Sequence, residues 1–332
     1  MTFTTTRRAL MSAVAAGALL LSAGASLAQD KITLRLSSVN TETDSRAIGL
    51  IEKFGPGVAE FANFEPHWNG TLFKQGTELE AIARGNLEMS IASAQEFSSF
   101  FPEFTILTAG YVHQSAEHQI AVFNDPIMDP LKAKVEAELG VKLLTVMYLG
   151  KRQINLKGDK EIKTPADMAG IKLRMPGTDA WQFLGSALGA SPVPVAFPEL
   201  YTALQTGAVD GQDNPLPSVI DSKFYEVTNQ VVLTSHLVDL NYLTISKAAW
   251  DAMTPEQQAA TQAAADAAAE HARQMQLQKE ADAVAFLESQ GLKVYEPDVA
   301  AFRDAVQAAY LASDYAKDWP AGMLERINEL AK

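Results

Sequence analysis

Short apolar stretches alternate with amphipathic helical patterns along the first third of the chain. Residues 31–39 alternate apolar and polar side chains as a half-buried strand does, and 64–68 and 87–92 are further runs of strand length. Residues 47–61 and 77–85 carry apolar side chains at helical spacing. This order predicts a βαβαβ unit.

The same alternation returns between residues 171 and 215, where polar side chains stand at strand ends. The predicted strands are 171–175, 191–195 and 208–210, and the predicted helices are the apolar segment around Trp181 and a segment at 198–206 that Gly207 ends. These elements predict an α/β fold with a parallel or mixed sheet. Arg174 and Asn214 stand beside helix-breaking residues, in positions where open α/β sheets bind ligands.

One helix in the last third of the chain is predicted to be long. Thr254 and Gln257 have capping-box spacing, Pro255 suits the first helical position, and no breaker follows before Gln290. At 1.5 Å per residue this helix would be about 50 Å long. The other predicted elements are a strand at 141–148 before a crossover at Gly150, strands at 229–233 and 237–245, and helices at 127–139, 217–223, 298–310 and 323–331.

The N-terminus and the composition indicate an exported protein. Arg7 and Arg8 precede a short apolar run, and Ser26-Leu27-Ala28 fits a cleavage site, so residues 1–28 are predicted to be a signal peptide. The absence of cysteine excludes disulfides and a lipid-bearing cysteine, which favours a free periplasmic protein. Removing Arg7 and Arg8 changes the formal charge from −13 to −15, which argues against nucleic-acid binding.

Motifs of enzymes and metal sites are missing from the sequence. It contains no Gly-x-Ser-x-Gly elbow, His-Glu-x-x-His helix or phosphate loop. His113 and His118 lie five residues apart, a spacing that does not place two imidazoles on one helical face, and we interpret both as structural. The sequence thus favours a binding protein without metal or organic cofactor over an enzyme.

Arg174 has two interpretations. It can be an exposed arginine that closes a strand, or its guanidinium can face a cleft and bind a carboxylate through two parallel hydrogen bonds. The turn Met175-Pro176-Gly177 favours the second interpretation, because it would leave Arg174 at a crevice.

The same region resembles the solute-binding proteins of TRAP transporters, the DctP-like receptors. The resemblance is carried by DMAGIKLR, which ends at Arg174, by GASPVP from Gly189, and by FPELYTALQTGAVDGQDNP from Phe197 to Pro215. It extends over nearly the whole mature chain. It implies a two-lobed periplasmic-binding-protein (Venus flytrap) fold with mixed sheets and a long helix bridging both lobes. Lobe I would comprise 29–149 and about 239–280, and lobe II 150–238 and about 281–332.

The resemblance also implies ligand contacts. Arg174 would bind a carboxylate, Arg152 would be a second cation, Asn214 would supply amide hydrogen bonds, and Phe197 would form an apolar wall. In lobe I it aligns Asn40, Lys74 and the segment Ser93 to Glu96 with ligand-contacting positions. Sialic-acid receptors of the family carry a glutamate and an arginine where this chain has Ser93 and Glu96, so the distal pocket differs from theirs.

The class of solute stays open between two alternatives. A sugar acid, such as a uronate or aldonate, would use Asn40, Asp44, Ser93, Gln95 and Glu96 for its hydroxyls, and these acidic groups favour it. A C4-dicarboxylate would instead need Lys74 or Arg152 for its second carboxylate. The implied partners are the small and large membrane subunits of a TRAP transporter, with the receptor itself a monomer. An ABC-type binding protein is the remaining alternative.

Overall fold

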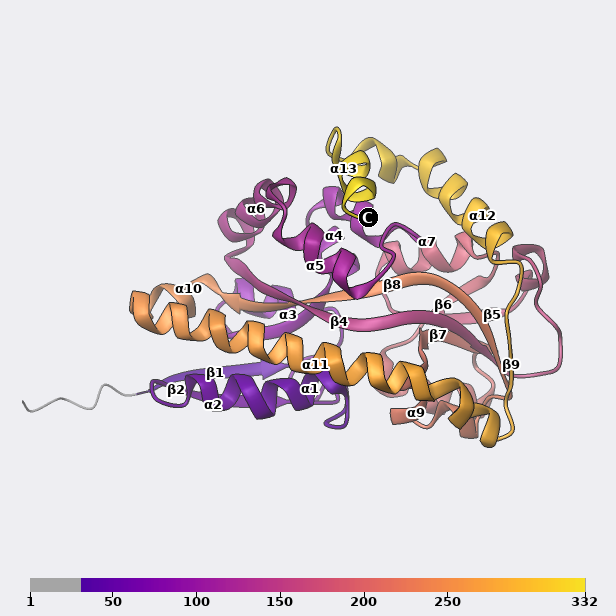
Figure 1. The fold of residues 1–332 in the computed structure, drawn as a ribbon, viewed down its shortest axis with the longest axis horizontal. Coiled ribbons are helices and arrows are strands. Elements are labelled where there is room, and N and C mark those ends of the chain that lie inside the picture. The colour runs from indigo at the N-terminus through magenta and orange to yellow at the C-terminus, as the bar shows by residue number, and fades with distance from the viewer. Residues whose placement is uncertain (1–30, 332) are drawn as a thin grey trace, which may run out of the picture. The chain divides into compact units, whose positions relative to one another are not determined.

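The fold is built on one mixed β-sheet, with helices on both faces (Figure 1). A computed structural model describes residues 31–331, so the predicted signal peptide, residues 1–28, lies outside the described residues. Nine strands pair in the described part of the chain, in the order β2-β1-β3-β8-β4-β7-β5-β6, with β9 beside β8. The strands are β1 (Ile32–Ser37), β2 (Ala62–His67), β3 (Met89–Ser93), β4 (Val141–Leu156), β5 (Lys172–Met175), β6 (Ser191–Pro194), β7 (Gly211–Pro215), β8 (Gln230–Ser246) and β9 (Lys293–Tyr295).

The predicted helices lie near their predicted places, while residues 94–98, 116–124 and 247–251 form helices that were not predicted. The helices are α1 (Ser45–Gly49), α2 (Gly55–Val58), α3 (Glu78–Ala83), α4 (Ala94–Ser98), α5 (Ala116–Asn124), α6 (Asp129–Leu139), α7 (Asp179–Ala187), α8 (Leu200–Thr206), α9 (Leu216–Asp221), α10 (Lys247–Asp251), α11 (Pro255–Ser289), α12 (Val299–Ala312) and α13 (Met323–Leu330). A π-helical turn at Leu50–Phe54 joins α1 and α2, so the predicted helix at 47–61 is three short pieces. No described helix has the length and apolar character needed to cross a bilayer.

Two long antiparallel strands, β4 and β8, run through the middle of the sheet, and here three predictions were wrong. The strand predicted at 141–148 continues through Gly150 to Leu156. The strands predicted at 229–233 and 237–245 are one strand, in which Ser235 takes a positive φ of 46°. Gly150 has a φ of 126°, and a Cβ there would lie 2.7 Å from the Cβ of Pro215. Glycine thus lets the strand bend where an L side chain would be strained.

The strand predicted at 208–210 was also misplaced. Strand β7 begins at Gly211 and includes Asn214, and it pairs with β4 in antiparallel and with β5 in parallel orientation. A Cβ on Gly211 would lie 2.7 Å from the carbonyl oxygen of Asn155 in the neighbouring strand. Asn214 therefore lies inside the sheet, one strand away from Arg174 on β5.

Helix α11 confirms the predicted long helix and packs closely against the chain. Thr254 and Gln257 form the capping box, with Pro255 in the first turn. Its buried face is alanine-rich near α1 and α2, and a Cβ on Gly49 would lie 2.5 Å from the carbonyl oxygen of Ala268. Small side chains thus permit close contact between these helices. In Figure 1, α11 follows one face of the sheet from α2 to α9.

Hydrophobic side chains are buried in several clusters. One lies under β1 and β3 against the first half of α11, and includes Leu34, Phe54 and Ala268. Another packs Leu204 and Val231 against Leu287 in the second half of α11. The largest lies on the opposite face, and it contains residues from both predicted lobes. The lobe boundaries stay a prediction. At the C-terminal end of the chain, helix α13 packs against α5, and the Nε2 of His118 lies 2.7 Å from the carbonyl oxygen of Ile327.

Candidate functional site

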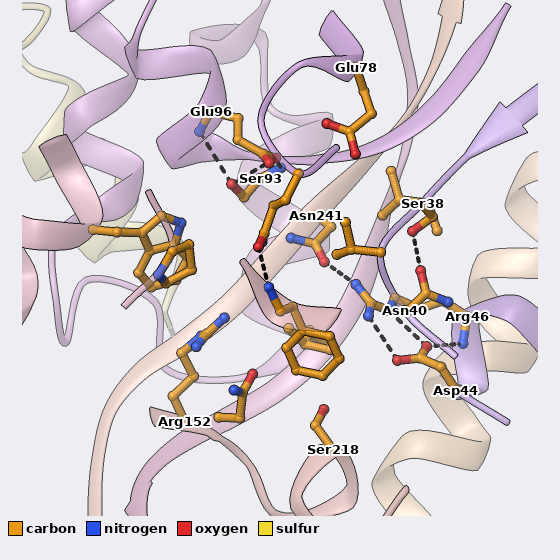
Figure 2. Close-up of a pocket in the computed structure, with 18 of the residues that line it drawn as sticks. Ser38, Asn40, Asp44, Arg46, Glu78, Ser93, Glu96, Arg152, Ser218 and Asn241 are labelled. Atoms are coloured by element: carbon orange, nitrogen blue, oxygen red, sulfur yellow. Dashed lines mark hydrogen bonds and ion pairs between the residues drawn. The ribbon is translucent and has the colours of Figure 1, made fainter. Parts of the chain in front are cut away.

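A polar cavity of about 70 Å³ lies at the carboxyl ends of β1, β3, β5 and β7 and beside the middle of β4 and β8 (Figure 2). Strand ends in an open α/β sheet expose backbone and side-chain groups that helices do not cover, which is why ligands bind there. Its lining residues are Ser38, Val39, Asn40, Asp44, Arg46, Gln75, Glu78, Ile91, Ser93, Glu96, Leu149, Arg152, Arg174, Pro176, Trp181, Phe197, Asn214, Ser218 and Asn241.

Arg174 is buried in this cavity without an acidic partner. Its side chain is on β5, the residue is 1% exposed, and no carboxylate of residues 31–331 forms an ion pair with it. Nε donates to the carbonyl oxygen of Val195 at 2.7 Å, Nη2 lies 3.4 Å from Oε1 of Gln75, and the guanidinium lies 5.8 Å from the centre of the Phe197 ring. Burial lowers the pKa of Arg174 to about 9, because desolvation disfavours the charged form.

Arg152 lies in the same cavity but is held by two buried carboxylates. Its Nε donates to Asp239 at 2.8 Å, and its Nη1 lies 3.2 Å from Oδ2 of Asp213. Asp213 also contacts Nε2 of His236 at 3.1 Å, and the guanidinium stacks over Trp181 at 4.3 Å. Arg152 thus belongs to a buried charge network that orients it toward the cavity.

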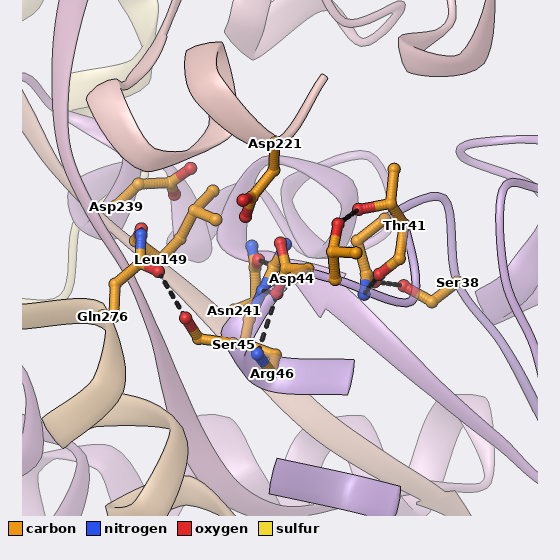
Figure 3. Close-up of polar contacts among 12 residues, drawn as sticks. Ser38, Thr41, Asp44, Ser45, Arg46, Leu149, Asp221, Asp239, Asn241 and Gln276 are labelled. Carbon is orange, nitrogen blue, oxygen red and sulfur yellow. Dashed lines mark hydrogen bonds and ion pairs between the residues drawn. The ribbon is translucent and has the colours of Figure 1, made fainter. Parts of the chain in front are cut away.

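Arg46 is a third cation of the lining, and sequence reasoning missed it. Asp44 accepts hydrogen bonds from its Nε at 2.9 Å and its Nη2 at 2.8 Å, while Nη1 donates to Asn241 (Figures 2 and 3). The carboxylate of Asp44 also accepts from the backbone N–H of Arg46 and caps α1. Although burial opposes it, the Arg46 charge lowers the pKa of Asp44. Arg46 lies in a helical stretch, where a surface arginine is the ordinary expectation, so no sequence signal distinguished it.

Acidic side chains line another part of the cavity. Glu96 and Ser93 form a capping box at the start of α4, with Oε2 of Glu96 accepting from the Ser93 backbone N–H at 2.7 Å. Glu78, which sequence reasoning missed, begins α3 and is 6% exposed. Burial raises the pKa of both carboxyl groups, and the neighbouring Glu96 helps to raise that of Glu78 to about 8.

The cavity brings together most of the side chains that the sequence suggested. Eight of the ten line it: Arg174, Asn214, Arg152, Phe197, Asn40, Ser93, Glu96 and Asp44. The structure places the other two elsewhere, since Lys74 is exposed and Gln95 is buried outside the lining. Gln75, beside Lys74, lines the cavity instead, and its Oε1 accepts from the backbone N–H of Phe197 at 2.8 Å. His113 and His118 are buried away from the cavity.

The fold and the cavity together define a class of protein. An α/β chain with a long helix, and with a cavity whose lining combines amides, carboxyl groups and an arginine without an acidic partner among the described residues, has the features of a receptor for a small polar anion. Residues 50–318 match the family described as bacterial extracellular solute-binding protein, family 7 (DctP), and the chain belongs to this family. The predicted family and fold class are therefore confirmed.

Similar proteins support this assignment. A solved TRAP periplasmic solute-binding protein from Roseobacter denitrificans, with bound 3-deoxy-D-manno-oct-2-ulosonic acid (KDO), is 63% identical; the match covers 91% of this chain and 100% of that chain, with a TM-score of 0.90. Another from the same organism, with bound L-galactonate, is 29% identical over 91% of this chain and 99% of that chain, with a TM-score of 0.81. The sialic acid-binding periplasmic protein SiaP of Vibrio cholerae is 29% identical, and the match covers 71% of this chain and 73% of SiaP.

Proposed function

We propose that this chain is the periplasmic receptor of a TRAP transporter for a sugar acid, whose carboxylate is bound by Arg174. The observation that carries the proposal is the guanidinium of Arg174, which is buried in the cavity without a carboxylate partner among the described residues. A buried unpaired cation is costly unless an anion compensates it. A solute carboxylate supplies that anion.

The neighbours of Arg174 suit a carboxylate-bearing solute. Asn214 lines the cavity from β7 and offers an amide, and Phe197 forms an apolar wall beside the guanidinium. Within residues 31–331, Arg152 uses Nε and Nη1 for its acidic partners, which leaves Nη2 as the donor for a solute. Arg152 is then a secondary contact, because Asp213 and Asp239 already neutralise its charge.

The far part of the cavity favours a sugar acid over a C4-dicarboxylate. A dicarboxylate needs a second free cation, and Lys74, the residue considered for that role, is exposed and outside the lining. Arg46 is paired with Asp44, and Arg152 with two aspartates. Ser93, Asn40 and Asn241 supply groups that pair with hydroxyls. The solved relatives that bind KDO and L-galactonate agree with this choice.

The mechanism follows from contacts that cross the cavity. Gln75 and Glu78 come from the predicted lobe I, and Arg174 and Phe197 come from the predicted lobe II. Gln75 accepts hydrogen bonds from both of these lobe II residues. A solute that touches both lobes stabilises their closed arrangement and shifts the population toward it. The closed monomer would then dock on the two membrane subunits, which by family analogy use an ion gradient. Residues 1–28 would direct export to the periplasm.

A thermal-shift screen tests the proposal. The panel contains KDO, L-galactonate and D-galacturonate, with galactitol as a polyol that lacks the carboxylate and succinate as a C4-dicarboxylate. A ligand at 100 times its Kd adds about 2.7 kcal/mol to the free energy of unfolding, which shifts Tm by several degrees. A saturable shift with a sugar acid and none with galactitol supports the proposal. Shifts with another chemical class and none with any carboxylate refute it.

A further inference from the structure

Two carboxyl groups of the cavity lack cationic partners. Glu78 and Glu96 both line it, and among the described residues no lysine, arginine or histidine lies within ion-pairing distance of either. Figure 2 shows both glutamates on the side of the cavity away from Arg152 and Ser218. The cavity therefore has a side of its own that is lined by carboxyl groups without a cation, separate from the arginines.

The electrostatics of this side make it selective. The charged groups that affect the pKa of Arg174 are Asp213 and Arg152, so neither glutamate neutralises the arginine that is proposed to bind the solute carboxylate. Burial and the proximity of Glu96 disfavour ionisation of Glu78, and burial disfavours ionisation of Glu96. A second carboxylate brought here would meet two carboxyl groups and no cation in a poorly solvated place. Its binding would therefore cost either repulsion from an ionised glutamate or the uptake of a further proton. A hydroxyl group, in contrast, donates a hydrogen bond to a carboxylate and brings no charge.

We propose that Glu78 and Glu96 determine specificity by rejecting a second carboxylate, so that the receptor accepts solutes with one carboxylate and an uncharged, hydroxyl-bearing far end. This inference rests on the proposed function, because it takes the first carboxylate to be bound at Arg174. It assigns to Glu78 and Glu96 the discrimination between an aldonate or uronate and the corresponding aldarate, which carries a carboxylate at both ends. Specificity of this kind comes from an unfavourable contact with the wrong solute.

The test compares these solutes in wild type and in Glu78→Gln/Glu96→Gln. Calorimetric titration with KDO, L-galactonate and D-galacturonate is set against galactarate, which is L-galactonate with its terminal CH2OH group oxidised to a second carboxylate. The wild type should bind its best monocarboxylate at least about tenfold more tightly than galactarate. The double variant should reduce this ratio by at least about tenfold. Glutamine at position 96 can still cap α4, because glutamine also completes a capping box.

Glu80→Gln is the matched control. Glu80 is on the same helix, exposed and outside the cavity, so its change removes one charge and an exposed ion pair with Arg84 but leaves the cavity lining intact. It should keep the wild-type ratio, and Glu78→Gln alone should lower the ratio in the same direction as the double variant. An unchanged ratio in both glutamate variants, an equal change in Glu80→Gln, or wild-type binding of galactarate as tight as that of the monocarboxylates refutes the inference. Failure of every monocarboxylate to bind wild type instead refutes the proposed function.

Discussion

Replacement of Arg174 by alanine is the most direct test of the candidate site. The guanidinium is buried, donates to the carbonyl oxygen of Val195 at 2.7 Å, and has no acidic partner in the described chain. If it binds the solute carboxylate, its removal leaves that carboxylate in a closed cavity without its main cation. Truncation of one member of such a pair costs about 2–5 kcal/mol, so the affinity should fall at least about thirtyfold.

Arg174→Lys separates charge from geometry. Lysine keeps the positive charge but presents a single ammonium group in place of the planar fork that matches a carboxylate. It also lacks the Nε donor that is fixed on Val195. We expect an affinity between those of wild type and Arg174→Ala.

Arg174→Ala should change the stability of the protein without solute much less than it changes the affinity. The pKa of Arg174 is about 9 in the folded protein, below its ordinary value of 12.5, so folding disfavours the charged form. This cost is fully present below pH 9 and disappears as the pH rises toward 12.5. At pH 7, removal of the charge relieves that cost, while loss of the bond to Val195 and of side-chain packing opposes it. The net change in unliganded stability should therefore be small, within about 2 kcal/mol.

Calorimetric titration and unliganded melting curves of both variants measure these effects. Arg35→Ala is the control. Arg35 is on β1, outside the cavity, and pairs with Glu88 at 2.7 Å, so its loss can affect the stability of the protein but should leave the affinity for the solute unchanged. Wild-type affinity in Arg174→Ala, or a large loss of unliganded stability with unchanged affinity, would show that Arg174 has only a structural role.

Three further predictions follow from side chains in and around the cavity. Lys74→Ala should leave sugar-acid affinity within about tenfold of wild type in calorimetric titration, because Lys74 is exposed outside the lining; a larger loss would place it in the site. Arg152→Met should lower unliganded stability by about 3–5 kcal/mol in urea denaturation, since it leaves the buried Asp213 and Asp239 unpaired; a change below about 1 kcal/mol would contradict the network. Folding raises the pKa of Glu78 from 4.5 to about 8, so the unfolded state loses its proton first, and the stability of wild type falls between these pH values by up to about 1.4 kcal/mol per pH unit. Glu78→Gln should therefore exceed wild type in stability by more at pH 8 than at pH 5. A difference in stability that is independent of pH would refute this.

Local sequence patterns predicted elements whose signals are contained within a few residues. Helix α11 is an example, because Thr254, Pro255 and Gln257 encode its start and no breaker follows for some thirty residues. Strand boundaries in the middle of the sheet were less predictable. Gly150 and Ser235 look like breaks in the sequence, yet β4 and β8 continue past them, because pairing between the two strands compensates for unfavourable local conformations.

The candidate site divides in the same way. Arg174 and Asn214 could be selected because turn-forming residues beside them mark strand ends, and the family motifs supported them. Gln75, Glu78 and Arg46 carried no such signal, since each lies at a turn or in a short helix where a polar residue is ordinarily exposed. Lys74 shows the converse: one position along the chain separates an exposed lysine from a glutamine that contacts the cavity.

By itself, the sequence determined the α/β class, the long helix and the type of chemistry at the strand ends, because these depend on periodicity, capping and turn residues close together in the chain. Only the tertiary structure decided which charges are neutralised. In the sequence, Arg152, Arg46 and Arg174 are the same type of residue. In the structure, Arg152 pairs with Asp239 and Arg46 pairs with Asp44, whereas Arg174 has no acidic partner among the described residues. Asp44 and Arg46 are two positions apart, but Arg152 and Asp239 are 87 positions apart, and no local pattern specifies which arginine is left without a carboxylate.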